Sequence, residues 1–173
     1  VKGGRSESGS HGSGVVIGAG DVIDNGKAGI VHVHSGAGVV GGDIFLKASD
    51  SMKGTGGALI MSSGAGVGPS HEGGDATLSA GTGHQFAAGG TVSILAGDGD
   101  VGSPGGSVRL HGGAASSSGG EITIFSGSSL TGSSGLLSIG TGSAAKSGKS
   151  GDLFISSGPS SNGVTGTIMI ESG

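Results

Sequence analysis

The chain has 173 residues, of which 45 are Gly and 12% are charged, with a net charge of −4 and no Cys. This length fits one domain, and the absence of Cys rules out a disulfide framework. The few basic residues are scattered, which argues against nucleic acid or an anionic membrane as a partner, because both bind clustered Lys and Arg. No apolar run is long enough to span a bilayer, so we expect no membrane insertion.

Residues 1–28 come first in chain order and lack a regular pattern. They hold one degenerate copy of the later repeat, GVVIGAG, which begins at Gly14. The opening stretch VKGGRSESG has neither an initiator Met nor the apolar core of a signal peptide, so we expect a processed or excised piece. We predict an irregular N-terminal lead-in over residues 1–28 with one degenerate coil.

From Gly29 onward the chain is a tandem repeat with a mean period of about 15 residues. Ten segments follow the pattern G-x-h-x-h-x-s-G, in which h is apolar and s is small. They are residues 29–36, 42–49, 57–64, 74–81, 90–97, 106–113, 120–127, 135–142, 151–158 and 166–173. All twenty h positions are apolar, and the last position is Gly in nine segments, with Ser49 as the exception.

This pattern indicates stacked strands. Alternation with period two places both h residues on one face of a strand. One short strand cannot bury that face alone, but identical neighbours about 4.8 Å apart would align the h residues into apolar ladders. Glycines can adopt positive φ and so form tight corners. We therefore predict an all-β fold, a single β-solenoid (β-helix) of about ten to eleven coils over residues 29–173, with parallel strands stacked in register and Gly-rich corners.

Motifs that resemble catalytic or ligand sites lack the surroundings that their chemistry requires. Gly36, Gly38 and Gly41 match the dinucleotide pattern G-x-G-x-x-G, but a strand-like segment follows them instead of a helix that would bind the pyrophosphate. His32 and His34 share an outward face without an evident third metal ligand. We expect no enzyme activity, no catalytic residue, no cofactor and no bound metal.

The face opposite the h columns also carries apolar residues. They are Phe45, Ile60, Leu95, Phe125, Phe154 and Met169. Such groups on a repeat surface commonly mark contact with another chain, and the alternative is that an intervening segment folds over them. The last repeat, residues 166–173, has no polar cap after it. We therefore expect self-association, as a homo-oligomer or filament, or continuation by adjoining segments of a longer chain.

The motif GGxhxhxSG across residues 29–173 resembles Gly/Ser-rich tandem-repeat proteins of extracellular matrices and appendages, including some algal surface proteins. The resemblance implies an extracellular or cell-surface location. We predict a non-catalytic structural protein of an extracellular fibre, appendage or surface layer that associates through its faces or ends. The alternative is a surface- or ligand-binding protein, such as an ice-binding protein or a glycan-binding adhesin. The outward positions lack the regular Thr ladder of ice-binding repeats, with Thr only at Thr77 and Thr123.

Overall fold

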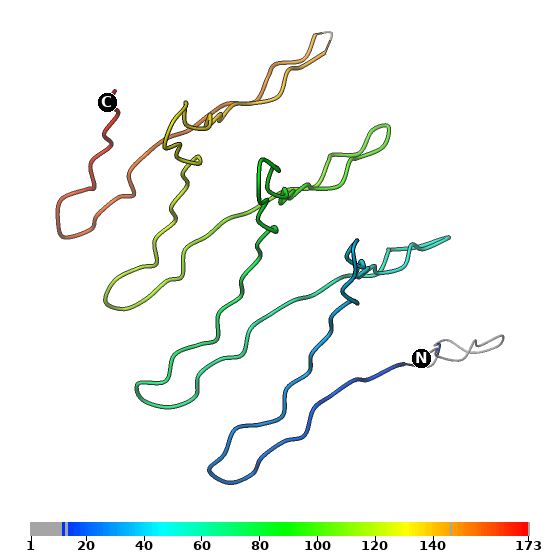
Figure 1. The fold of residues 1–173 in the computed structure, drawn as a ribbon. Coiled ribbons are helices and arrows are strands. Elements are labelled where there is room, and N and C mark those ends of the chain that lie inside the picture. The colour runs from blue at the N-terminus through cyan, green and yellow to red at the C-terminus, as the bar shows by residue number, and fades with distance from the viewer. Residues whose placement is uncertain (1–11, 13, 146, 173) are drawn as a thin grey trace. The chain divides into compact units, whose positions relative to one another are not determined.

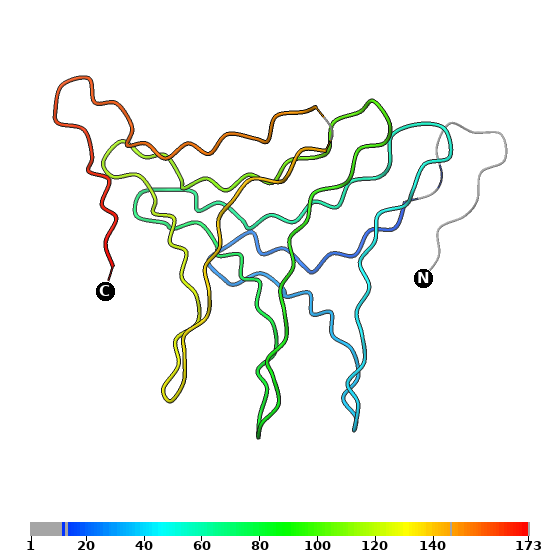
Figure 2. The ribbon, with the colours of Figure 1, turned by 90° about the horizontal axis from the view of Figure 1, so that it is seen from above.

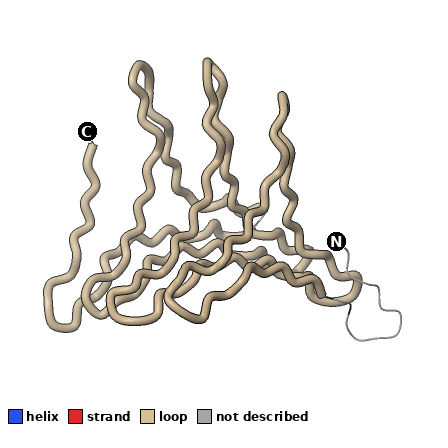
Figure 3. Tube along the Cα trace, turned by 60° about the horizontal axis from the view of Figure 1, so that its bottom comes forward, coloured by secondary structure: helices blue, strands red, loops and turns tan. Residues whose placement is uncertain are grey.

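The computed structural model describes residues 12, 14–145 and 147–172. The chain divides into two units, Val1–Ala80 and Gly81–Gly173. Within each unit the backbone runs in extended stretches that reverse direction at loops (Figures 1 and 2). The described residues contain no helix and no β-strand, and the tube in Figure 3 has the colour of loops throughout its described part.

The predicted all-β fold is therefore wrong, because the described chain forms no β-solenoid and no stack of parallel strands. A stack requires ladders of backbone hydrogen bonds between coils, and the described residues form none. The h side chains are at most about half covered, and none of the described residues is buried. Alternation determines which side chains share a face, but it does not bring a second segment close enough to cover that face.

The lead-in predicted over residues 1–28 lies partly outside the described residues, which omit 1–11 and 13. The degenerate copy that begins at Gly14 is described, and it ends at Gly20 without forming a strand. Its last residue accepts a hydrogen bond from the N–H of Gly29 at 2.9 Å. The degenerate copy thus joins the first full segment through the same bond that recurs along the repeats.

Pairs of residues at the segment ends close the loops between segments. We call the last residue of a segment its closing residue and the first residue of the next segment the opening glycine. Opening Gly106, for example, donates its N–H to the carbonyl oxygen of closing Gly97 at 2.8 Å. The loops closed by this bond are 20–29, 36–42, 49–57, 64–74, 81–90, 97–106, 113–120 and 127–135. At these eight loops the repeat boundaries are therefore the two ends of a closed loop, not corners between stacked coils.

The opening glycine packs against the small residue that precedes the closing residue. A Cβ added to Gly42 would lie 3.3 Å from the Cβ of Ser35, and one added to Gly106 would lie 3.4 Å from the Cβ of Ala96. Ser35 also donates its hydroxyl to the carbonyl oxygen of Gly42 at 2.7 Å, and it is one of the few described residues that are partly covered. The small column and the opening glycine thus have one common cause, the close approach of two backbones at the base of a loop.

The described glycines at the segment ends do not have positive φ. Among the described glycines, Gly68 with a φ of 119° and Gly102 with a φ of 80° have positive φ, and both lie inside loops. The prediction that Gly-rich corners use positive φ is therefore wrong at the segment ends. There the opening glycine provides room for a neighbouring backbone.

Replacing Gly120 by Ala tests this role of the opening glycine. The added Cβ would lie 2.9 Å from the backbone N of Gly113, so the two backbones must separate and the bond from residue 120 to Gly113 weakens. Amide exchange at residue 120, measured by NMR relative to its intrinsic rate, should accelerate about fivefold, because a hydrogen bond contributes about 1 kcal/mol net.

Gly113→Ala is the matched control, since no atom lies within 4 Å of a Cβ added there. The amide at residue 120 should then exchange at its parent rate. Equal acceleration in the two variants would contradict the steric explanation.

Candidate interaction surface

Uncovered apolar surface is the main chemical feature of the described chain. The accessible surface is 17122 Å². A folded monomer of 15.9 kDa exposes about 7,300 Å², and the same chain fully unfolded exposes about 23,000 Å². This chain therefore keeps about 10,000 Å² more surface in water than a globular protein of its mass. Burial of apolar surface, the main driving force of folding, is largely unrealised within it.

The two faces of the segments differ in exposure. Val, Leu and Ile at the first h position are 44–56% exposed, and the apolar side chains at the second h position are 54–86% exposed. The six residues predicted as an interaction surface, which lie on the opposite face, are 72–87% exposed. The first h position is thus the more covered one, a difference that alternation does not predict, and both faces of a segment remain open to a partner.

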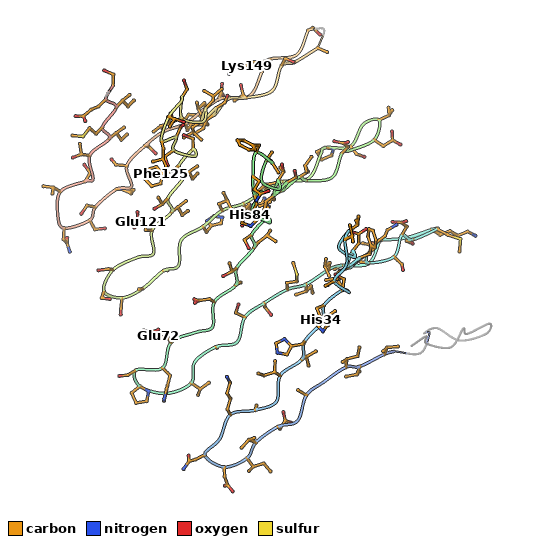
Figure 4. All side chains as sticks on the ribbon, in the orientation of Figure 1. His34, Glu72, His84, Glu121, Phe125 and Lys149 are labelled. Atoms are coloured by element: carbon orange, nitrogen blue, oxygen red, sulfur yellow. The ribbon has the colours of Figure 1, made fainter. Side chains whose placement is uncertain are left out.

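The six residues of that predicted surface are distributed over both units. Phe45 and Ile60 lie in the first unit, and the other four lie in the second. Figure 4 labels Phe125, which belongs to segment 120–127. The parallel stack that was expected to align these residues on one face does not form in the described chain. Each of them is an exposed group on its own segment, and its role in binding stays a prediction.

The loops carry a further group of exposed apolar side chains, which the sequence analysis missed. Met52, Val67, Phe86, Val101 and Leu130 are all at least 88% exposed. They follow no regular period, so alternation could not predict them. The presence of a large apolar residue in most of the loops was the signal available in the sequence. Isolated exposed apolar side chains are common on proteins, so these loop residues serve below as controls.

Serine side chains order three of the loops. Ser51 Oγ accepts a hydrogen bond from the N–H of Gly54 at 2.8 Å, and Ser129 Oγ accepts one from Gly132 at 2.9 Å. Loop 158–166 contains the same S-x-x-G turn. Serine hydroxyls commonly satisfy backbone N–H groups in this way at turns. Loops 49–57 and 127–135 are therefore held both at their base and within the loop, and loop 158–166 is held by its serine.

A shallow groove of about 300 Å³ lies between segments 57–64 and 74–81 of the first unit. It is lined by Met61, Ser62, Ser63, Ala76, Thr77 and Leu78. These side chains offer apolar contact and hydroxyl groups, but no carboxylate, imidazole or amine. The groove therefore lacks the paired acid and base groups that an active site commonly brings together.

Charged and imidazole side chains are spread along the chain. Figure 4 shows His34 and Glu72 of the first unit far apart, and likewise Glu121 and Lys149 of the second. Lys149 pairs locally with Asp152 at 2.7 Å, and exposed pairs of this kind contribute little to stability. Across residues 12, 14–145 and 147–172, no group of three or more His, Asp or Glu is placed to hold a metal ion. That part of the chain also has no helix that is long and apolar enough to cross a membrane.

Comparison with known proteins finds no matching family model, no matching curated protein and no matching solved structure. The resemblance to extracellular repeat proteins therefore stays a prediction, as do the absence of a cofactor and the absence of catalytic residues.

A dye that binds exposed apolar surface tests this description of the chain. At high dilution the protein should enhance the fluorescence of anilinonaphthalene sulfonate, which reports exposed hydrophobic surface. The enhancement per chain should fall as protein concentration rises, if other chains cover the surface. A folded globular protein of similar mass is the control. Equally low fluorescence from both at the highest dilution would contradict the exposure described above.

Proposed function

We propose that this chain is a non-catalytic structural protein that self-associates in an extracellular fibre, appendage or surface layer. The observation that carries the proposal is that apolar segments recur ten times and remain uncovered in the single chain. Contact with other chains removes apolar surface from water, which lowers the free energy of the chains. The extracellular setting comes from the resemblance of the repeat to matrix and appendage proteins.

The size of the uncovered surface favours another protein chain over a small ligand. A standard protein interface covers about 800 Å² on each partner, which is far less than the excess of about 10,000 Å² on this chain. A molecule bound in the groove between Met61 and Leu78 would cover only a small part of it. Contact along the whole chain, with more than one partner, is needed to cover the segments.

The dispersed polar groups support a non-catalytic role. Catalysis commonly uses several acid, base or nucleophilic groups that converge on a concave site. In the described chain the groove carries apolar and hydroxyl groups, and the labelled carboxylates and imidazoles lie in different segments and loops. These features are typical of a protein whose function depends on its assembly.

Three substitutions in the segments test the proposal. Ile94→Asp, Ile124→Asp and Ile155→Asp together place carboxylates on the surface that we expect other chains to cover. Burial of unpaired charge is strongly unfavourable, so the concentration of half-assembly should rise at least about tenfold. Sedimentation velocity measures this concentration, and electron microscopy should show filaments or sheets for the parent chain.

Three loop substitutions provide the matched control. Met52→Asp, Val101→Asp and Leu130→Asp add the same charge at side chains that are at least 99% exposed. They should leave the concentration of half-assembly within about twofold of the parent value, as is usual for surface changes. A parent chain that stays a monodisperse monomer at all concentrations would refute the proposal. If that monomer shaped growing ice crystals or bound a glycan, the alternative function would replace it.

A further inference from the structure

The closing glycines recur without a reason that the single chain supplies. A Cβ added at any of eight of them would meet no atom within 4 Å, and none of the eight has positive φ. They are Gly36, Gly64, Gly81, Gly97, Gly113, Gly127, Gly142 and Gly158. Neither crowding nor backbone conformation inside the described chain therefore requires glycine at these positions.

Ser49, the one closing residue that is not glycine, also shows that loop closure does not require glycine. Ser49 occupies a closing position, and its carbonyl oxygen still accepts the bond from opening Gly57 at 2.9 Å. A side chain is thus compatible with loop closure. Glycine loses more conformational freedom on ordering than any other residue, so its repetition at an uncrowded position opposes order in the chain. A requirement from outside the chain explains why it recurs.

The backbone between the segment ends points to the nature of that requirement. Within the described segments, the backbone hydrogen bonds to other backbone groups are made at the opening and closing residues, and the N–H and C=O groups between them have no such bond. Extended backbone with unpaired N–H and C=O groups is a template for pairing with another chain. A bare Cα at the closing position allows a neighbouring backbone to approach closely.

We propose that the partner is a second copy of this chain, which pairs edge to edge along the segments and packs its backbone onto the closing glycines. This inference rests on the proposed self-association. A second copy has the same spacing of about 15 residues, so all of the segments can pair at once. A net charge of −4 over 173 residues causes little repulsion between copies. The pairing is between chains, and it does not restore the single-chain stack that the structure contradicts.

Alanine at three closing positions tests the inference. Gly64→Ala, Gly97→Ala and Gly127→Ala together add three methyl groups where the single chain has open space. The carbonyl groups that close the loops are unchanged, so the dilute chain should retain its loops. The added methyl groups keep the second backbone away. We expect the concentration of half-assembly, measured by sedimentation velocity, to rise at least about tenfold.

Alanine at three loop glycines is the matched control. Gly41 has no atom within 4 Å of an added Cβ, and Gly54 and Gly132 have only a serine hydroxyl, at 3.5 Å. Gly41→Ala, Gly54→Ala and Gly132→Ala should together change the concentration of half-assembly by less than about twofold. The reverse substitution, Ser49→Gly, should lower that concentration, because it removes the one side chain in the column.

The outcomes separate this inference from the proposed function. If the parent chain assembles and the closing and loop variants assemble equally well, the inference is overturned and the structural function stands. If the parent does not assemble, the proposed function itself fails. Amide exchange at opening Gly74, Gly106 and Gly135 monitors the loops in the dilute chain. Faster exchange there in the closing variant would also overturn the inference, because the closing position would then be crowded within the chain.

Discussion

A hydrogen bond from the N–H of the opening glycine to the carbonyl oxygen of the closing residue holds the base of eight loops in this chain. The bond brings two backbones close together, so the small side chain before the closing residue lies against the opening glycine. The fit is tight at five opening glycines, Gly29, Gly42, Gly57, Gly106 and Gly120, where an added Cβ would lie 3.3 Å or less from a neighbouring atom. The segments begin and end at the bases of the loops, and the apolar side chains between the bases remain uncovered.

Local order and overall stability therefore have different origins in this protein. The loops are ordered by short-range bonds, such as those of Ser51 with Gly54 and of Ser129 with Gly132. Such bonds contribute about 1 kcal/mol each and cannot substitute for a hydrophobic core. In the proposed assembly, contacts between chains provide the stabilising burial. A chain of this kind would order its loops alone and acquire its stability on association.

The sequence predicts where the repeat segments begin and end, but not how they pack. Matching letters identified the ends of the segments, and the structure places Ser35 of the small column against opening Gly42, a contact that was not predicted. Alternation predicted that both h positions face a core, but several side chains at the second h position are as exposed as those on the opposite face. It could not show that Ile44 or Ile122 would remain about half-exposed, because coverage depends on the distance to a neighbouring segment. A solenoid was predicted because apolar columns require cover, and the described chain does not supply that cover.

The predicted interaction surface stays a prediction. Phe125 and Phe154 stand out as apolar residues in outward positions, and the structure finds them exposed, as it does nearly all described residues. Met52 and Leu130 were missed because they follow no period. The closing glycines were assigned to tight corners, since glycine has two physical uses that look alike in a sequence. Only coordinates distinguish a glycine that needs positive φ from one that leaves room for another chain.

The central claim is that the apolar segments are covered only between chains, and urea unfolding at several protein concentrations tests it most directly. Stability that comes from association depends on protein concentration by mass action. The account predicts that the urea midpoint rises steadily with concentration and that the dilute chain shows no cooperative transition. A cooperative transition whose midpoint is the same at every concentration would contradict the account, because it would show a core buried within one chain.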